Sequence, residues 1–128
     1  MPSDSAIRHF RPAQNGDVLA ITEIYNEGIA SGLGTFETRL REPSEIEAWL
    51  PTIERYPLWV ATLDNQVVGF ARLSSYRDRP CYDGIAEFSI YLKKSAQGQG
   101  IGRELLTALL AAATDAGFHK VFVSYLHF

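Results

Sequence analysis

The sequence lacks the features that mark several classes of protein. It has a single cysteine, Cys81, which excludes a disulfide within the chain, and this cysteine and the three histidines do not show the spacing of a metal site. We therefore expect no metal. No run approaches the roughly twenty apolar residues of a membrane helix. Residues 1–10 also lack the basic and apolar regions of a secretory signal. A cytoplasmic location without a membrane partner is expected.

The charge balance argues against another class. Lysine and arginine number 12, aspartate and glutamate number 15, and the net charge is −3. Proteins that bind nucleic acids usually carry a basic excess on one face, so no nucleic-acid partner is expected. Apolar residues make up 46% of the 128 residues and charged residues 21%, which is typical of a globular domain with a buried core. We expect one domain over residues 1–128.

Hydrophobic periodicity predicts eight elements in the order β-α-α-β-β-β-α-β. Strands are expected at residues 7–11, 58–63, 66–74, 84–92 and 120–128, and helices at residues 17–31, 44–56 and 99–116. Consecutive strands joined by short turns pair antiparallel, and the last helix links two parallel strands. The expected fold is therefore α+β (α/β), with a mixed, mostly antiparallel sheet flanked by helices.

Local signals refine these elements. Asp64 and Asn65 tolerate positive φ and favour a tight hairpin. Ser44 and Glu47 have the spacing of a capping box, and Tyr56, which precedes a proline, is expected to end the same helix. The apolar positions of the last helix, which we expect in the core, are Ile101, Leu105, Leu106, Leu109, Leu110 and Ala113. The strand at 84–92 is expected to direct Ala86, Phe88, Ile90 and Leu92 to one face and Glu87, Ser89 and Tyr91 to the other.

Three alternate glycines, Gly98, Gly100 and Gly102, connect that strand to the last helix. Glycine permits tight turns and brings bare N–H groups close to a ligand. The first amides of a helix lack partners within it, and the helix dipole adds positive potential. Such a loop favours a bound phosphate. The alternative is a glycine-rich connection that serves only to pack the strand closely against the helix.

Two common phosphate loops do not fit. A Walker A loop ends in Gly-Lys-Ser/Thr, whereas Arg103 follows Gly102, and a Rossmann fingerprint needs a glycine where Leu105 stands. The motif Gln97-x-x-Gly100-x-Gly102 instead resembles the acetyl-CoA signature Gln/Arg-x-x-Gly-x-Gly/Ala of the GNAT superfamily of N-acetyltransferases. The expected order of elements is also similar to the N-terminal portion of that fold, and the resemblance covers nearly the whole chain.

Three further segments are similar to the phosphinothricin and methionine-sulfoximine N-acetyltransferases: Ile24-Tyr25-Asn26, Thr35-Phe36-Glu37 and residues 87–92. Members of that group acetylate the α-amino group of small amino-acid analogues. The resemblance implies an enzyme that takes acetyl-CoA as co-substrate and a small-molecule amine as acceptor.

The resemblance also implies roles for single residues. Glu87 would be the base that removes a proton from the substrate amine, and its alternative is a solvated carboxylate on a strand face. A backbone amide near Ile90 would stabilise the oxyanion. The backbone of Ile90, Tyr91 and Leu92 would pair with the pantetheine arm like an added strand. The amides expected to cradle the pyrophosphate are those of Gln97, Gly98, Gln99, Gly100, Ile101, Gly102 and Arg103.

Candidate substrate contacts lie in two loops and one strand. Phe36 and Glu37 would line the substrate pocket, and the alternative is a core aromatic beside a surface acid. Arg72, Arg77 and Arg79 can hold a carboxylate or phosphinate through paired hydrogen bonds, whereas arginines on loops are often only solvated.

Relatives of this kind continue for several tens of residues beyond the strand at 120–128. The resemblance implies that this part would supply an asparagine that contacts the cofactor, a helix, two strands and the residue that reprotonates the thiolate. The chain is therefore expected to be truncated at its C-terminus. Three explanations stay open: a fragment or frameshifted reading; a fold completed by a second copy, as a homodimer, or by a partner strand; and a non-catalytic acyl-CoA-binding or dimerising domain.

Overall fold

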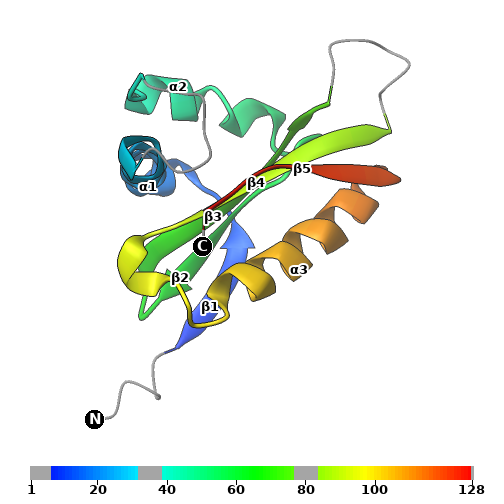
Figure 1. Ribbon diagram of the computed structural model, residues 1–128. Coiled ribbons are helices and arrows are strands. Elements are labelled where there is room, and N and C mark those ends of the chain that lie inside the picture. Colours follow the sequence, from blue (N-terminus) through cyan, green and yellow to red (C-terminus); the bar gives the residue numbers. More distant parts are fainter. Residues whose placement is uncertain (1–6, 32–38, 77–83, 128) are drawn as a thin grey trace.

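The computed structural model describes residues 7–31, 39–76 and 84–127, and it contains one five-stranded sheet (Figure 1). The strands lie in the order β1-β2-β3-β4-β5, and every neighbouring pair is antiparallel except the parallel pair β4 and β5. This arrangement confirms the expected fold class. The strands are β1 (Arg8–Pro12), β2 (Leu58–Leu63), β3 (Gln66–Ser75), β4 (Ile85–Leu92) and β5 (Lys120–His127). The helices are α1 (Val18–Ser31), α2 (Pro43–Glu47) and α3 (Ile101–Asp115), with single 3₁₀ turns η2 (Asn15–Asp17), η3 (Leu50–Thr52) and η5 (Lys94–Ala96).

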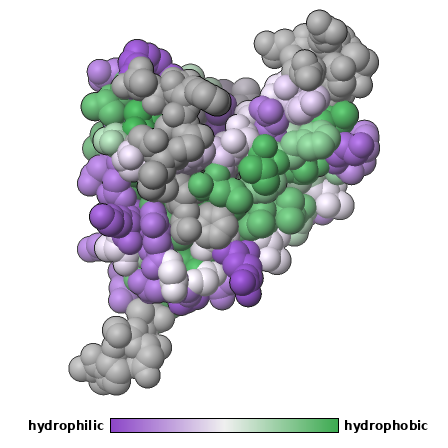
Figure 2. All heavy atoms as spheres, viewed as in Figure 1, coloured by the Kyte–Doolittle hydropathy of each residue, from purple (hydrophilic) through white to green (hydrophobic). Residues whose placement is uncertain are grey.

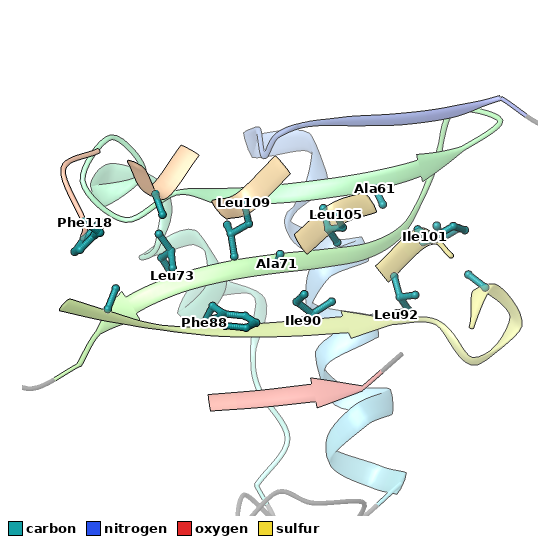
Figure 3. Close-up of a cluster of buried hydrophobic side chains, with 14 residues drawn as sticks. Ala61, Ala71, Leu73, Phe88, Ile90, Leu92, Ile101, Leu105, Leu109 and Phe118 are labelled. Atoms are coloured by element: carbon teal, nitrogen blue, oxygen red, sulfur yellow. The ribbon is translucent and has the colours of Figure 1, made fainter. Parts of the chain in front are cut away.

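The helices lie on opposite faces of the sheet, with α1 and α2 on one face and α3 on the other (Figure 1). Figure 3 shows Leu105 and Leu109 of α3 against the side chains of Ala71, Ile90 and Phe88. The alternation expected for β4 is confirmed, because the even-numbered residues 86–92 all belong to this α3-side cluster and Tyr91 belongs to the cluster under α1. The two faces of β4 therefore serve different layers of the protein.

The hairpin between β2 and β3 forms as its turn residues predict. Asp64 and Asn65 have φ values of 51° and 69°. Two successive residues with positive φ are the geometry of a type I′ turn, whose twist matches that of the flanking strands.

The second helix is shorter than its periodicity suggests. We expected one helix over residues 44–56, but α2 ends at Glu47 and a 3₁₀ turn follows it. Pro51 has no N–H to donate to the carbonyl four residues earlier, so the α-helical pattern cannot continue. Ile53 instead donates its N–H to the Leu50 carbonyl at 3.1 Å. Most of the apolar face survives this change, because Trp49, Leu50 and Ile53 still pack against the core cluster under α1.

Two finer expectations are wrong. The helix cap uses Glu42 and Glu45 rather than Ser44 and Glu47, and the Glu42 N–H donates to the Glu45 carboxylate at 2.7 Å. Pro43 occupies the first helical position, where its fixed φ and missing N–H are favourable. The cap is therefore the residue before it, Glu42. Leu110 of α3 is 41% exposed rather than part of the core. The alanines around it leave that side of the helix open.

Candidate active site

The loop between β4 and α3 has the backbone that its glycines predict. Gly98 and Gly100 have φ values of 78° and 83°, and Gly100 is the residue that precedes the first turn of α3. A side chain placed at Gly98 would meet no atom within 4 Å, so the loop backbone is open on that side. Gly98, Gln99 and Gly100 are all exposed.

The loop also presents a continuous set of N–H donors. Among the described residues, no backbone carbonyl accepts a hydrogen bond from the N–H groups of residues 98–103, and the first N–H to donate to a carbonyl is that of Glu104, which bonds to Gly100 at 3.2 Å. The side chain of Ile101 is buried in the core, so only its backbone faces the loop. Bare amides at a helix N-terminus suit a diphosphate. The residues present therefore fit the pyrophosphate of a nucleotide cofactor.

Polar side chains hold this loop in shape. The Gln97 amide group donates to the Leu92 carbonyl at 3.2 Å, and the Gln99 amide group donates to the Ser95 carbonyl at 3.1 Å. From the neighbouring helix α1, the Glu27 carboxylate accepts the Lys94 N–H at 2.7 Å. The side chains of the two glutamines therefore shape the loop. The Gln97 N–H donates to the Lys94 carbonyl at 3.3 Å, so of these two backbone amides only that of Gln99 is left to the ligand.

The backbone of β4 alternates between its two neighbours. The Lys93 N–H donates to the Val68 carbonyl at 2.8 Å, so the polar groups of odd-numbered residues in this strand face β3. Of the three residues expected to pair with pantetheine, Ile90 and Leu92 thus direct their backbone groups toward the β5 side, and Tyr91 directs its groups toward Phe70. In the structure β5 runs along this side, with Leu126 opposite Ile90.

Glu87 lies on the face of β4 that is covered by α1 and α2, opposite Ser74 of β3 and Phe122 of β5. Its side chain is half-buried. Within the described part of the chain, no hydrogen bond or ion pair engages its carboxylate. A half-buried carboxylate without a cationic partner is suited to accept a proton from a substrate.

Arg72 shares this face with Glu87 at a diagonal position, because Arg72 lies opposite Ser89. Its guanidinium stacks on the Trp49 ring at 3.9 Å from the centroid, and no carboxylate of the described residues pairs with it. Burial lowers the pKa of Arg72, while the Tyr25 and Tyr91 side chains act in the opposite direction. Arg72 also lines a cavity of about 190 Å³, together with Trp49, Thr52, Tyr56, Leu58, Leu73, Ser74 and Ser75.

A cluster of aromatic rings lies next to Arg72 on the same face of the sheet. Tyr91 stacks on Phe70 at 5.1 Å between ring centroids and lies 5.0 Å from Tyr25 and 4.8 Å from Tyr125. Trp49 completes the cluster at 5.8 Å from Tyr25. The cluster joins α1, the residue that precedes η3, and three strands, and it fixes the surface on which Arg72 lies.

Other expected residues fall outside the described ranges, namely Phe36, Glu37, Arg77 and Arg79. Within those ranges no group of His, Cys, Asp and Glu is arranged to hold a metal, and no described helix is both long and apolar enough to cross a membrane. The role of Trp49 beside Arg72 was not foreseen, because the two residues meet only through the packing of η3 on the sheet.

A model of the acetyltransferase (GNAT) family matches residues 20–126, which include most of α1, the strands β2 to β4, the whole glycine loop, α3 and most of β5. The chain belongs to the GNAT family. Phosphinothricin N-acetyltransferase of Streptomyces coelicolor is 31% identical over 127 residues, covering 95% of this chain and 74% of that protein. L-methionine sulfoximine/L-methionine sulfone acetyltransferase of Salmonella typhimurium is 31% identical, covering 85% of this chain and 65% of the relative.

One of the solved structures similar to this chain contains bound acetyl-CoA. The phosphinothricin acetyltransferase of Sinorhizobium meliloti, solved in complex with acetyl-CoA, is 37% identical with a TM-score of 0.78. The match covers 84% of this chain and 60% of that protein. This GNAT chain thus spans about two thirds of the length of these relatives.

Proposed function

We propose that this GNAT chain transfers the acetyl group of acetyl-CoA to the α-amino group of a small amino-acid analogue of the phosphinothricin or methionine sulfoximine and sulfone type. One observation carries the proposal. The strand β4 holds the Glu87 carboxylate, which has no partner among the described residues, and five residues separate the end of this strand from the bare amides of residues 98–103. A base on a strand that leads into a pyrophosphate cradle suits direct transfer between two bound substrates.

The amides of residues 98–103 and the N-terminus of α3 would hold the pyrophosphate, and the backbone groups of Ile90 and Leu92 would hold the pantetheine arm. In this mode the last part of β5, from Leu126, has to separate from β4, because it lies along the same edge. Acetyl-CoA supplies a thioester carbonyl. The Ile90 N–H, which faces this edge, is the candidate donor to the oxyanion that develops on that carbonyl.

Glu87 would accept the proton that the substrate ammonium must lose before it can react. The neutral amine would then attack the carbonyl carbon, so that the new C–N bond forms and the C–S bond breaks with the electron pair leaving on sulfur. The proton that the nitrogen loses as the amide forms would be taken up by the thiolate, which gives free CoA. Removal of the carboxylate as base is expected to lower kcat by about 10²–10⁴-fold.

Arg72 supports a substrate with an acidic group. A partly buried guanidinium without a carboxylate partner among the described residues is suited to bind an external carboxylate or phosphinate through two hydrogen bonds. Its diagonal place relative to Glu87 would set the acid and amino groups of one small molecule a few ångströms apart. We therefore expect amines that lack an acidic group to be poor acceptors.

The test is acetyl transfer to phosphinothricin, methionine sulfoximine and methionine sulfone, with the two methionine derivatives also compared with their decarboxylated amines, which keep no acidic group. We expect transfer to at least one of the amino acids and none to the decarboxylated methionine derivatives, and Arg72→Met should raise KM for the acid at least tenfold, equivalent to about 1.4 kcal/mol. Arg41→Met is the matched control, because Arg41 also contacts a ring of the aromatic cluster, that of Tyr25 at 5.5 Å. Equal turnover of the amino acid and its amine would refute the role of Arg72.

A non-catalytic, dimerising domain is the alternative. Figure 2 shows apolar side chains gathered over β5, where Phe122, Val123 and Leu126 are 41%, 56% and 43% exposed. Light scattering on the same preparation separates the two functions: a dimer that transfers no acetyl group to any of the acceptors would favour the alternative.

A further inference from the structure

Arg8, the first residue of β1, reaches across to the glycine loop. Its Nη2 group donates to the Gln99 carbonyl at 2.7 Å, and its Nη1 group donates to the Glu104 carboxylate at 2.8 Å. These contacts join residues 91 and 96 positions apart in the sequence. Both partners lie close to Gly100 in the sequence, and a Cβ added at Gly100 would lie 3.9 Å from Arg8 Nη1.

The contact with the Gln99 carbonyl determines where the next amide points. The peptide bond between Gln99 and Gly100 is planar and trans, so its C=O and N–H groups point to opposite sides of the chain. Arg8 holds the oxygen on its own side and thereby directs the Gly100 N–H away from itself. That N–H belongs to the set of bare amides in residues 98–103.

The loop needs such a restraint. Gly98 and Gly100 both have positive φ, and glycine adopts positive and negative φ with similar ease. The peptide between Gln99 and Gly100 can therefore rotate at little cost unless something holds it. A charge-assisted hydrogen bond from a guanidinium to the carbonyl is among the stronger restraints available. The Glu104 carboxylate, in the first turn of α3, holds the guanidinium in place.

We infer that Arg8 is a positioning residue for the acetyl-CoA pyrophosphate: it fixes the Gln99–Gly100 peptide so that the Gly100 N–H faces the ligand. The inference rests on the proposed function. Arg8 acts through the peptide without touching the phosphates. The ion pair with Glu104 is partly exposed and is expected to add little to the stability of the fold.

Calorimetric titration with CoA and with 3′-dephospho-CoA tests this role. Arg8→Met is expected to raise both dissociation constants about tenfold, equivalent to about 1.4 kcal/mol, because both ligands carry the pyrophosphate. Arg8→Lys keeps one donor for the Gln99 carbonyl and should recover most of the affinity. Arg55→Met is the matched control, since Arg55 donates to the Ala116 carbonyl at 3.0 Å beyond the other end of α3. It should leave both constants unchanged.

A double variant separates positioning from charge neutralisation. If Arg8 merely cancels the charge of Glu104, which would repel a diphosphate, then Arg8→Met combined with Glu104→Gln should regain the original affinity, and this result would overturn the inference. If Arg8 positions the peptide, the double variant stays as weak as Arg8→Met. If the unaltered protein binds CoA tightly and Arg8→Met does not change this affinity, only the inference about Arg8 is overturned. If the unaltered protein does not bind CoA, both the proposed function and the inference are overturned.

Discussion

Replacement of Gly100 by alanine tests the glycine loop with the least ambiguity. Its φ of 83° lies in the left-handed region, and the nearest atom of another segment to an added methyl group is Arg8 Nη1 at 3.9 Å. The methyl group therefore meets no steric obstacle, and the cost is backbone strain alone. A left-handed conformation costs a residue other than glycine about 1–2 kcal/mol. The free energy of unfolding of Gly100→Ala should fall by this amount, unless the loop relaxes.

The two responses of the loop differ in their effect on CoA binding. If the loop keeps its shape, stability falls and CoA affinity is preserved; if the loop relaxes, stability is retained and the dissociation constant for CoA rises about five- to thirtyfold, the equivalent of the same strain energy. Urea unfolding followed by the fluorescence of Trp49 and Trp59, together with CoA calorimetry, measures both quantities. Gly100→Asn should cost less, because asparagine visits the left-handed region more readily.

Gly16→Ala is the matched control for this substitution. A side chain at Gly16 would meet no atom within 4 Å, and Gly16 is not among the glycines with positive φ. Its replacement should therefore be neutral or stabilise the protein by up to about 1 kcal/mol. A Gly100→Ala protein with both the stability and the CoA affinity of the unaltered chain would refute the left-handed geometry of the loop.

Two further predictions concern the fold. Gly69→Ala should lower the free energy of unfolding by about 1–3 kcal/mol in urea titrations, because an added Cβ would collide with the Leu92 side chain and approach the Tyr91 carbonyl oxygen to 3.0 Å; unchanged stability would mean that β3 and β4 are further apart. Burial alone would raise the pKa of Asp17, but hydrogen bonds from Arg11 and the Gln14 N–H outweigh it and lower the pKa. The carboxylate therefore stabilises the fold above its unfolded pKa of about 3.9, and this contribution is lost as the pH falls through the lower folded value. Unfolding free energies of the unaltered protein and Asp17→Asn should accordingly differ at pH 7 and converge toward pH 2, and a difference independent of pH would contradict this.

The fold was largely predictable because its main signals are local. The turn at Asp64 and Asn65, the alternation in β4 and the glycines before α3 each act within a few residues. The short α2 was mispredicted because the apolar spacing hid the missing N–H of Pro51. The contacts of Arg8 and the stacking of Arg72 on Trp49 were not predictable, since they join segments that only the folded sheet brings together.

The role of Glu87 rested on the family resemblance rather than on the residues around it. A glutamate on an alternating strand can lie on a solvated face or in an active site, and only the resemblance to the family favoured its interpretation as the base. The structure places it half-buried, on the same face as Arg72. This arrangement depends on the register between β3 and β4, which the sequence does not specify at single-residue level.

The most direct measurement is CoA calorimetry combined with acetyl-transfer kinetics on the unaltered protein and Glu87→Gln. The account predicts that both proteins bind CoA with the same dissociation constant and that kcat for a phosphinothricin-type acceptor falls by about 10²–10⁴-fold in the variant. Full turnover by Glu87→Gln, or loss of CoA binding in that variant, would contradict the assignment of Glu87 as a base separate from the pyrophosphate cradle.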